Sequence, residues 1–426
     1  MQADTLPDDS CEDDDKLLSF FCICGLSHGS ELELETFGKE GVNHVPPLER
    51  SYVAKILASY PRRRKRLTFP EEVLSLCLPR GLRFCTQKDC LDRSFHSFVL
   101  ITAEGRRVDG CALTFWEECH DSTVCHAMQA LHNQYVTELS SGRTGAPGDQ
   151  DRLAVGGAGS CHTLPKRGRS SHGDKGGSGV EGGRAKRSSF YDASKDTLYV
   201  SKCIAVLCPL PAVYACRLVL EGLHDFILAP GPPPLPLESY VYWMLHQIPL
   251  PPQGRSLKLT LNGVNIVCQR PSVTELPFFD YSFLEAFELI GVESFLKIYT
   301  CVLLEHQVLL CSRALQKLML IAECLTVLLF PFRWEHVYVP ILPYAQALFL
   351  EAPLPFIMGL HYEDCIPADV LQSNICVVDI DGAHVELPED LPPLPDRSEL
   401  TQEIFLVMER YKTQPITNHD RRLEWQ

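Results

Sequence analysis

The pattern of apolar and polar positions first predicts a small α+β lobe. Short apolar runs, typical of buried strands, occupy residues 17–25, 73–78, 95–102 and 108–117. A short turn containing Gly105 separates the last two runs, which indicates a β-hairpin. Residues 125–139 then carry apolar side chains at helical spacing. We therefore expect residues 17–140 to form one lobe.

After residue 190 the pattern becomes an alternation of strands and helices. Residues 197–208 are a near-continuous apolar strand, and helical spacing follows over 212–228. Strand candidates at 307–312, 334–342, 356–361 and 376–380 are interleaved with helical stretches at 282–290, 293–304 and 315–330. Such alternation is typical of a mostly parallel sheet with helices on both faces. We predict a second lobe over 191–385, with a hairpin at 257–268 around Asn262 and Gly263.

Three segments have compositions that do not suit a packed core. Residues 1–16 contain seven acidic side chains and suggest a disordered tail. Residues 141–190 hold 13 of the 27 glycines and nine Lys or Arg against four acids, which favours a flexible linker. Within it, Ser170 and Ser189 follow basic residues and are candidate phosphorylation sites. Residues 386–426 combine a proline-rich tail with a short helix at 400–411.

Charge and cysteine content narrow the classes of function. The 426 residues carry a net charge of −15, which argues against nucleic acid as a partner. Nineteen cysteines lie scattered through apolar stretches without a CxxC pair, so the spacing does not indicate a zinc site. The acidic N-terminus does not read as a signal peptide, so we expect a reduced, cytoplasmic protein without a disulfide framework. The apolar stretches are also too short for a membrane span.

The sequence shows no recognisable catalytic motif. A phosphate-binding lysine loop, a GxSxG elbow, an HExxH pair and an EF-hand loop are all missing. The formal GxGxxG at 177–182 lies in low-complexity sequence instead of between a strand and a helix. We therefore expect no cofactor and no metal, and we favour a protein that acts through its surfaces.

Four polar residues border apolar strand candidates, where functional sites of open α/β sheets gather: Glu305, Arg333, Glu335 and Asp381. The alternative interpretation is that they are ordinary solvated strand ends. Phe332 and Trp334 fit the core better than a partner surface. A run of five cations could contact anionic lipid, act as a nuclear signal or simply form a solvated loop: Arg62, Arg63, Arg64, Lys65 and Arg66.

Several long motifs resemble DENN domains. The strings at 283–287 (FLEAF), 291–295 (GVESF), 304–312 (LEHQVLLCS), 329–343 (LFPFRWEHVYVPILP), 351–361 (EAPLPFIMGLH) and 377–381 (VVDID) closely resemble the central DENN section, whose start is similar to 199–204 (YVSKCI) with 218–226. Residues 76–81 (LCLPRG), 95–102 and 110–117 look like the upstream section. The opening FFCICG at 20–25 is similar to the subgroup whose full-length members continue into RUN and PLAT domains.

This resemblance implies a longin-like first lobe, a Rossmann-like central lobe and a third, largely helical section. Only 45 residues follow Asp381, so we expect that third section to be mostly absent. The implied activity is guanine-nucleotide exchange on a Rab-family GTPase held between the lobes, in the cytoplasm and peripherally on Golgi or endosomal membranes. Glu305, Arg333, Glu335 and Asp381 then become candidates for GTPase contact. The alternatives are a Rab-binding adaptor without exchange activity and, more distantly, a metabolic enzyme.

Overall fold

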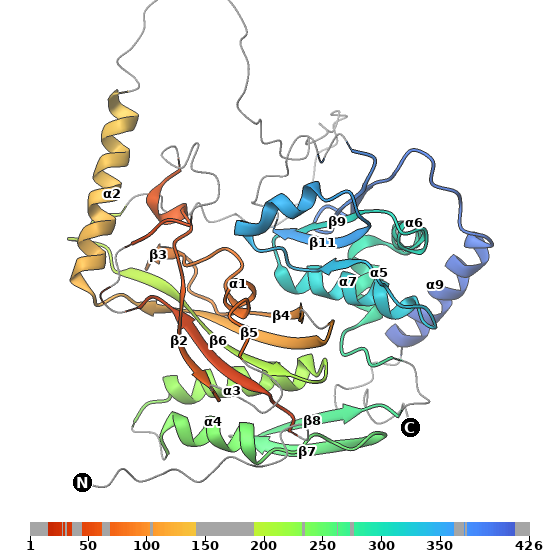
Figure 1. Ribbon diagram of the computed structural model, residues 1–426, viewed down its shortest axis with the longest axis horizontal. Helices are drawn as coiled ribbons and strands as arrows, with labels where there is room; N and C mark the ends of the chain where they lie inside the picture. Colours follow the sequence, from red (N-terminus) through yellow and green to blue (C-terminus); the bar gives the residue numbers. More distant parts are fainter. Residues whose placement is uncertain are drawn as a thin grey trace, which may run out of the picture.

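Two main β-sheets and a separate β-hairpin organise the chain in this computed structural model (Figure 1). The structure describes residues 16–27, 29, 32–35, 45–61, 69–102, 105–141, 191–231, 235–261, 263–272, 277–361, 370 and 373–413. The fold is mixed α/β, as the sequence predicts. The proposed tail at 1–16 and linker at 141–190 lie outside these residues, apart from Lys16 and Ser141.

The first sheet is antiparallel throughout. Its strand order is β2 (Lys55–Tyr60), β1 (Phe20–Gly25), β6 (Leu198–Cys208), β5 (Arg107–Glu118) and β4 (Ser94–Ile101), and the short β3 (Phe84–Thr86) also pairs with β6. The β4–β5 hairpin expected from the sequence is confirmed, because the two strands pair from Ser94 with Thr114 to Ile101 with Arg107.

Strand β6 corrects one sequence-based expectation. We expected residues 197–208 to open the second, mostly parallel sheet. Instead, β6 lies at the centre of the first sheet, where it pairs antiparallel with β1 on one side and β5 on the other. The first sheet is therefore assembled from segments on both sides of residues 142–190.

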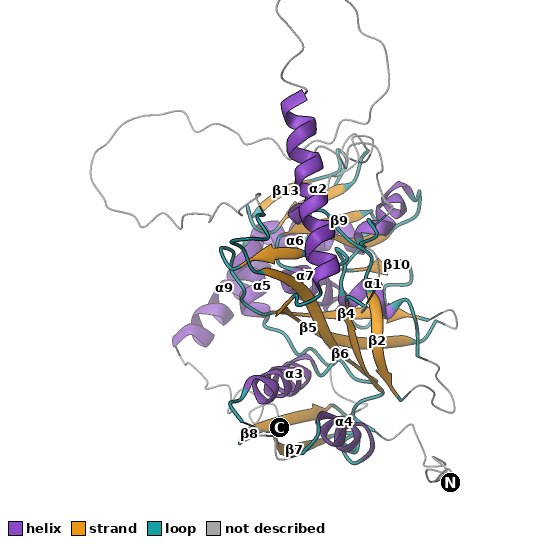
Figure 2. Ribbon diagram, turned by 90° about the vertical axis from the view of Figure 1, so that its left-hand side faces the viewer, coloured by secondary structure: helices purple, strands orange, loops and turns teal. Residues whose placement is uncertain are grey.

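Both faces of the first sheet are covered by other parts of the chain. Successive side chains of a strand point to opposite faces, so each strand contributes to both cores. On β6, Cys203 and Ala205 face one core while Ile204 and Val206 face the other. The first core includes residues of η3 (Pro47–Glu49), α1 (Val73–Cys77) and α2 (Ser122–Ser141). The second includes α3 (Val213–Leu228), α4 (Leu237–His246) and the hairpin of β7 (Arg255–Leu261) and β8 (Val264–Arg270), on the opposite side in Figures 1 and 2.

Of two further elements that pack against this sheet, one differs from its expected form and the other matches it. The apolar run at 73–78 forms helix α1 and no strand. The 257–268 hairpin is confirmed, with Leu261 opposite Val264 and Gly263 at a positive φ of 80°. Asn262 of that turn lies outside the described residues.

The second sheet is mostly parallel, as expected. Its order is β10 (Val337–Val339), β11 (Phe356–His361), β9 (Val308–Ser312), β12 (Cys376–Asp379) and β13 (His384–Glu386). The first four strands run parallel, and β13 pairs antiparallel with β12. All of its strands come from residues 308–386, so the parallel sheet begins about a hundred residues later than the predicted lobe.

Helices cover one face of the second sheet. That face packs against α5 (Phe283–Ile290), α6 (Val292–Leu303) and α7 (Leu315–Leu328). On the opposite face, the described residues that pack against the strands come from η4 (Tyr344–Glu351) and include Val370 and Ile375. Leu310 faces the helices and Leu309 the opposite side. Helix α9 (Arg397–Thr413) packs on α6 through Met408, and no helix among the described residues is long and apolar enough to cross a membrane.

Candidate functional site

The loops that enter the parallel strands form one edge of the second sheet, which we call the amino edge. It consists of residues 303–307 before β9, 328–336 before β10 and 348–355 before β11. Side chains tie these loops together. The Gln307 Nε2 group donates to the carbonyls of Ala352, at 2.7 Å, and Leu354, at 3.1 Å. The hydroxyl of Tyr299 on α6 donates to the Leu328 carbonyl at the end of α7.

Glu305 occupies an unusual backbone position on this edge. Helix α6 ends in a Schellman motif, in which the N–H of Glu305 donates to the Val302 carbonyl and the N–H of His306 to the Cys301 carbonyl. The residue after such a helix end adopts the left-handed conformation and is usually glycine. Glu305 takes it with φ of 56°, at a cost of about 1–2 kcal/mol for a residue with a Cβ. A carboxylate is therefore held where the fold alone would favour glycine.

The loop before β10 brings the other candidates to the same edge. Arg333 and Glu335 are exposed there, and His336 Nε2 lies 3.2 Å from Glu305 Oε1. Trp334 is half-buried, packs against the helical core and donates from Nε1 to the Val337 carbonyl, as expected for a core residue. The same expectation is wrong for Phe332, whose exposed fraction is 71%. The structure thus places Glu305, Arg333 and Glu335 on one surface.

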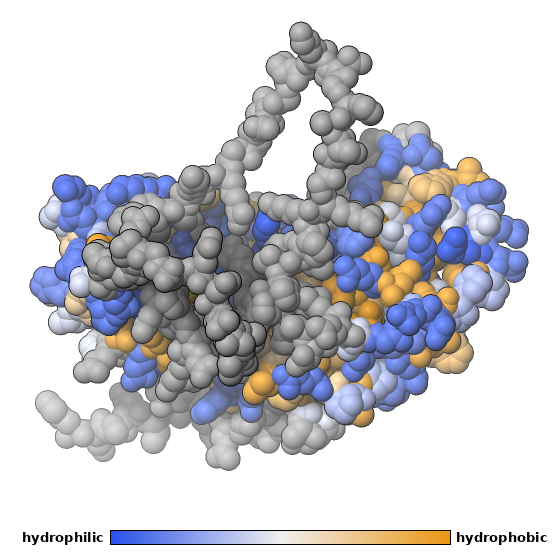
Figure 3. Space-filling model, turned by 90° about the horizontal axis from the view of Figure 1, so that it is seen from above, coloured by the Kyte–Doolittle hydropathy of each residue, from blue (hydrophilic) through white to orange (hydrophobic). Residues whose placement is uncertain are grey.

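Apolar side chains are exposed along the whole amino edge. We call this set the amino-edge surface: Leu303, Leu304, Leu328, Phe330, Phe332, Leu348, Phe349 and Leu354. Seen from above, apolar side chains gather over the part of the molecule formed by the second sheet and its helices (Figure 3). Exposed apolar groups with a polar rim mark sites of protein–protein interaction. Glu305, Arg333 and Glu335 supply such a rim.

Asp381 lies at the opposite edge, where β9 and β12 end. Its carboxylate accepts from the Arg313 backbone N–H at 2.7 Å, from Lys317 Nζ at 2.9 Å and from Ser312 Oγ at 3.2 Å. Burial works to raise the pKa of Asp381, but these donors outweigh it and the pKa is lowered. Asp381 therefore fixes the start of α7 and is not brought together with the other three candidates.

The remaining sequence-predicted residues cannot be placed in this geometry. The cationic run (Arg62, Arg63, Arg64, Lys65 and Arg66) and the two serines (Ser170 and Ser189) lie outside the described residues. Lipid contact and phosphorylation there stay predictions.

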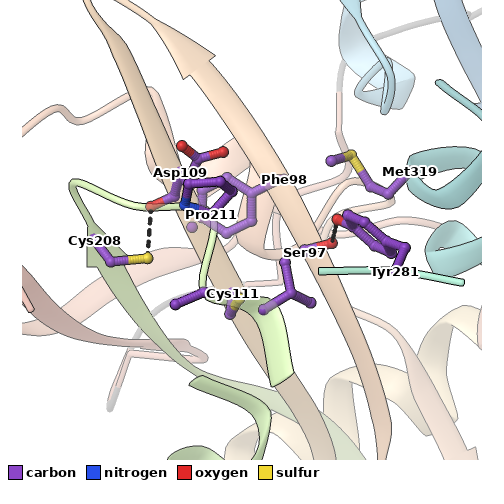
Figure 4. Close-up of a pocket in the computed structure, with 11 residues that line it drawn as sticks. Ser97, Phe98, Asp109, Cys111, Cys208, Pro211, Tyr281 and Met319 are labelled. Carbon is purple, nitrogen blue, oxygen red and sulfur yellow. Dashed lines mark hydrogen bonds between the residues drawn. The ribbon is translucent and has the colours of Figure 1, made fainter. Parts of the chain in front are cut away.

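A small pocket lies where the two sheets meet (Figure 4). It is lined by residues of β4, β5 and the start of α3, with Tyr281 and Met319 from the second half of the chain. The Tyr281 hydroxyl and Ser97 Oγ are hydrogen-bonded at 2.6 Å, and Cys208 Sγ donates to the Asp109 carbonyl. Even its empty volume of about 180 Å³, which includes space open to solvent, is below the roughly 300 Å³ at which small-molecule sites typically start, so this pocket is too small for one.

The fold also gathers thiols that the sequence spacing did not connect. Sγ atoms of Cys22, Cys24 and Cys77 all lie within 4.8 Å of one another, although 55 positions of sequence separate the first from the last. Among the described residues, these three cysteines are the group of three or more His, Cys, Asp or Glu side chains whose ligand atoms lie close enough together to hold a metal ion. The sequence contained no CxxC signal for it, because the ligands come from separate elements.

Comparison with known proteins finds two domain matches in these sheets. Residues 54–115 match the uDENN domain, and residues 199–383 match the DENN (AEX-3) domain. The chain contains a uDENN domain and a DENN domain. A relative found by sequence is the "DENN domain and WD repeat-containing protein SCD1" of Arabidopsis thaliana, 28% identical over 199 residues. That match covers 46% of this chain and only 17% of the relative's length.

The boundary of the DENN domain does not coincide with the boundary between the two sheets. The DENN domain starts at Tyr199, inside β6, so its first strand belongs to the same sheet as the uDENN strands β2, β4 and β5. Its later part includes the whole amino edge, from Leu303 to Phe356. DENN domains are known as a family of Rab exchange-factor modules.

Proposed function

We propose that this chain is a guanine-nucleotide exchange module for a Rab-family GTPase, and that the GTPase contacts the amino-edge surface. One observation carries the proposal: within a DENN domain, eight large apolar side chains stand exposed along a single edge, beside Glu305, Arg333 and Glu335.

Exchange requires contacts and no bond-making chemistry. A protein that binds the nucleotide-free GTPase better than the nucleotide-bound form shifts the population toward nucleotide release. The switch loops of a GTPase are ordered by the γ-phosphate and Mg²⁺, so a surface that holds them in another arrangement lowers the affinity for nucleotide. Exposed Phe330 and Phe332 can supply the apolar anchors, and the charged rim can fix the orientation.

The strained backbone at Glu305 supports a role for this residue in binding. Left-handed conformations at residues with a Cβ are retained where the surroundings impose them, and they cluster at functional sites. Glycine at this position would satisfy the helix end equally well. The carboxylate is therefore the feature that glycine cannot replace.

The proposal extends to the fold type of the two lobes, the subgroup of the domain and the membrane on which the protein acts. The first sheet would correspond to a longin-like lobe and the second to a Rossmann-like lobe, and the FFCICG opening supports relationship to the subgroup with RUN and PLAT domains. A Rab partner implies action at membranes of the Golgi or endosomes, with the cationic run as a lipid contact. Cosedimentation with anionic and neutral vesicles tests that last part.

The experiment is a screen of fluorescent-GDP release from purified Rab proteins by the whole chain. Phe332→Ser and Leu304→Ser should lower both binding and exchange by at least about tenfold, since central apolar anchors each contribute about 2 kcal/mol. Leu228→Ser is a matched control, because Leu228 is equally exposed but lies at the end of α3 in the first half of the fold. It should leave both quantities unchanged.

Glu305→Gly separates binding from folding. It should raise or preserve the melting temperature while weakening Rab binding. Binding without accelerated release, in the wild type, would favour the adaptor over the exchange factor. Absence of binding to every Rab tested would overturn both.

A further inference from the structure

The first core contains four buried cysteines, of which Cys22, Cys24 and Cys77 have mutually close sulfurs. Cys22 and Cys24 are two positions apart on β1, so both side chains point to the same face of the sheet. Cys203 is the cross-strand partner of Cys24 on β6. Cys77 is the last residue of α1, which lies over this face. Strand β1 and helix α1 therefore direct three thiols to one place, and Cys203 of β6 lies beside them.

The distances among these thiols suit metal coordination. The sulfurs of Cys22, Cys24 and Cys77 are all within 4.8 Å of one another. In a tetrahedral zinc site, Zn–S bonds of about 2.3 Å place the sulfurs about 3.8 Å apart. Small side-chain rotations would therefore bring the three sulfurs to bonding positions. The Cys203 sulfur lies outside this mutually close group, but its thiol interacts with Cys77, so a side-chain rotation would bring it in as the fourth ligand.

The surroundings also suit a structural site. All four cysteines are at most 1% exposed and lie in a core of aliphatic and aromatic side chains. Structural zinc sites are closed, with all four positions filled by protein ligands. Thiolate sulfur is also the ligand that selects zinc over the hard cations magnesium and calcium.

We propose that Cys22, Cys24, Cys77 and Cys203 form a zinc–thiolate site that joins α1 to the first sheet. The thiols that bind the ion release their protons to solvent, and no oxidation or reduction takes place. The ion would link segments that lie far apart in sequence, so it would stabilise the sheet formed by the uDENN strands and β6. This role is independent of the proposed action on a GTPase.

A second group of thiols provides an internal control. On the opposite face of the same sheet, Cys208 and Cys216 are also buried, and their sulfurs are 3.7 Å apart. They do not form a group of three donors that are all mutually close. Cys22→Val and Cys216→Val are therefore matched substitutions of one buried thiol by an apolar side chain of similar size, on opposite faces of one sheet.

The test is the metal content of the whole chain, purified without a histidine tag from zinc-supplemented cells. We expect about one zinc per chain by mass spectrometry of the metal, and X-ray absorption with sulfur neighbours at about 2.3 Å. Cys22→Val and Cys77→Ser should lose the zinc, whereas Cys216→Val should keep it. Chelation should lower the melting temperature of the wild type and of Cys216→Val.

Other outcomes would overturn the proposal. A wild-type chain without stoichiometric zinc, and without a rise in melting temperature when Zn²⁺ is added under reducing conditions, would show an ordinary core of free thiols. A disulfide among the four cysteines in the native protein would equally exclude the site. Zinc retained by both Cys22→Val and Cys77→Ser would place the metal elsewhere. Since the wild-type measurement needs no variant, a misfolded variant leaves the test decisive.

Discussion

The guanidinium of Arg107 binds the carboxylate of Glu323 across the junction of the two sheets. Its Nη2 atom lies 3.0 Å from both carboxylate oxygens, although 216 positions separate the two residues. Arg107 also contacts Asp109 on β5, and the Tyr338 hydroxyl donates to Glu323 at 2.5 Å. Burial alone would lower the pKa of Arg107, but the Glu323 and Asp109 carboxylates raise it. The first sheet and α7 are thus joined by a charge cluster whose carboxylates are buried and whose cation is partly exposed.

Arg107→Ala should destabilise the protein by about 1–3 kcal/mol, because it leaves two buried carboxylates without their cation; the loss is below that of a fully buried pair since the Arg107 side chain is 38% exposed. The side chains of Asp109 and Glu323 are only 11% and 6% exposed. Urea unfolding of wild type and variant measures the effect. Arg217→Ala breaks the exposed pair with Glu221 on α3 and should cost less than about 1 kcal/mol. Equal losses in the two variants would show that the junction is not buried in solution.

The same variant should show a characteristic pH dependence. Burial raises the pKa of Asp109, and Arg107 opposes this shift, so removing Arg107 should raise the pKa further. A carboxyl whose pKa is raised in the folded state binds more protons there than in the unfolded state, so its stability contribution falls as pH rises above the ordinary value of about 4. The deficit of Arg107→Ala should therefore shrink as the pH approaches 4. A deficit that grows on acidification would contradict this sign.

His96 should make the fold sensitive to mild acid. Its ring is buried, Nε2 lies 2.9 Å from the Leu76 carbonyl, and burial lowers its pKa to about 4. The unfolded chain binds a proton near pH 6.5 that the folded chain does not, so stability is lost as pH falls from about 6.5 toward 4, by up to about 3 kcal/mol. Unfolding titrations at pH 7.5 and 5 measure this loss. His96→Gln, which can still donate to Leu76, should flatten the profile; an unchanged slope would exclude His96 as its source.

Leu309 and Leu310 should contribute independently to the second sheet. Both are fully buried, but they belong to the cores on opposite faces. Each substitution to alanine should cost about 2–5 kcal/mol through lost burial and a residual cavity, and the double variant should cost roughly the sum. Leu348→Ala, at an exposed position, should change stability by no more than about 0.5 kcal/mol. Neutral effects at both buried positions would be incompatible with a sheet covered on both faces.

Gly359 of β11 should tolerate no side chain. A Cβ atom at this position would lie 1.9 Å from the Pro340 carbonyl oxygen, and the two backbones are held together because the Leu342 N–H donates to the Gly359 carbonyl. Gly359→Ala should cost about 3 kcal/mol. Gly222→Ala on helix α3 is the control, since the nearest atom would be at an ordinary 3.6 Å, and it should stabilise by up to about 1 kcal/mol. A neutral Gly359→Ala would show that β10 and β11 are further apart.

The sequence predicted local elements well and their partners less well. Strand β11 and helix α5 appear within a residue of their expected bounds, because burial and the Ser282 cap are encoded locally. The sequence does not predict the partners of β6, because a strand buried on both faces has the same apolar run in a parallel or an antiparallel sheet. The run at 73–78 was equally ambiguous, because five or six apolar residues suit a short helix as well as a strand.

The site residues show the same limit. Proximity to strand ends groups Glu305, Arg333, Glu335 and Asp381 together, because it does not distinguish the two edges of a sheet. The structure exposes the first three at the amino edge and places Asp381 at the other edge. Hydrophobicity favours a core position for Phe332, but the loop between α7 and β10 exposes it. The convergence of Cys22 and Cys77 depends on how α1 packs on the sheet, which no spacing rule records.

The central position of β6 has a consequence for the order in which the protein can form during synthesis. Before residue 208 has left the ribosome, the antiparallel pairs β1–β2 and β4–β5 lack the strand that joins them, because their inner strands β1 and β5 both pair with β6. Those unpaired edges are open to other chains until the last strand arrives. Folding of the uDENN part therefore has to wait for the start of the DENN domain, and the two should behave as one cooperative unit. Expressed separately, each would be an incomplete piece that recovers a native sheet only by pairing with the other.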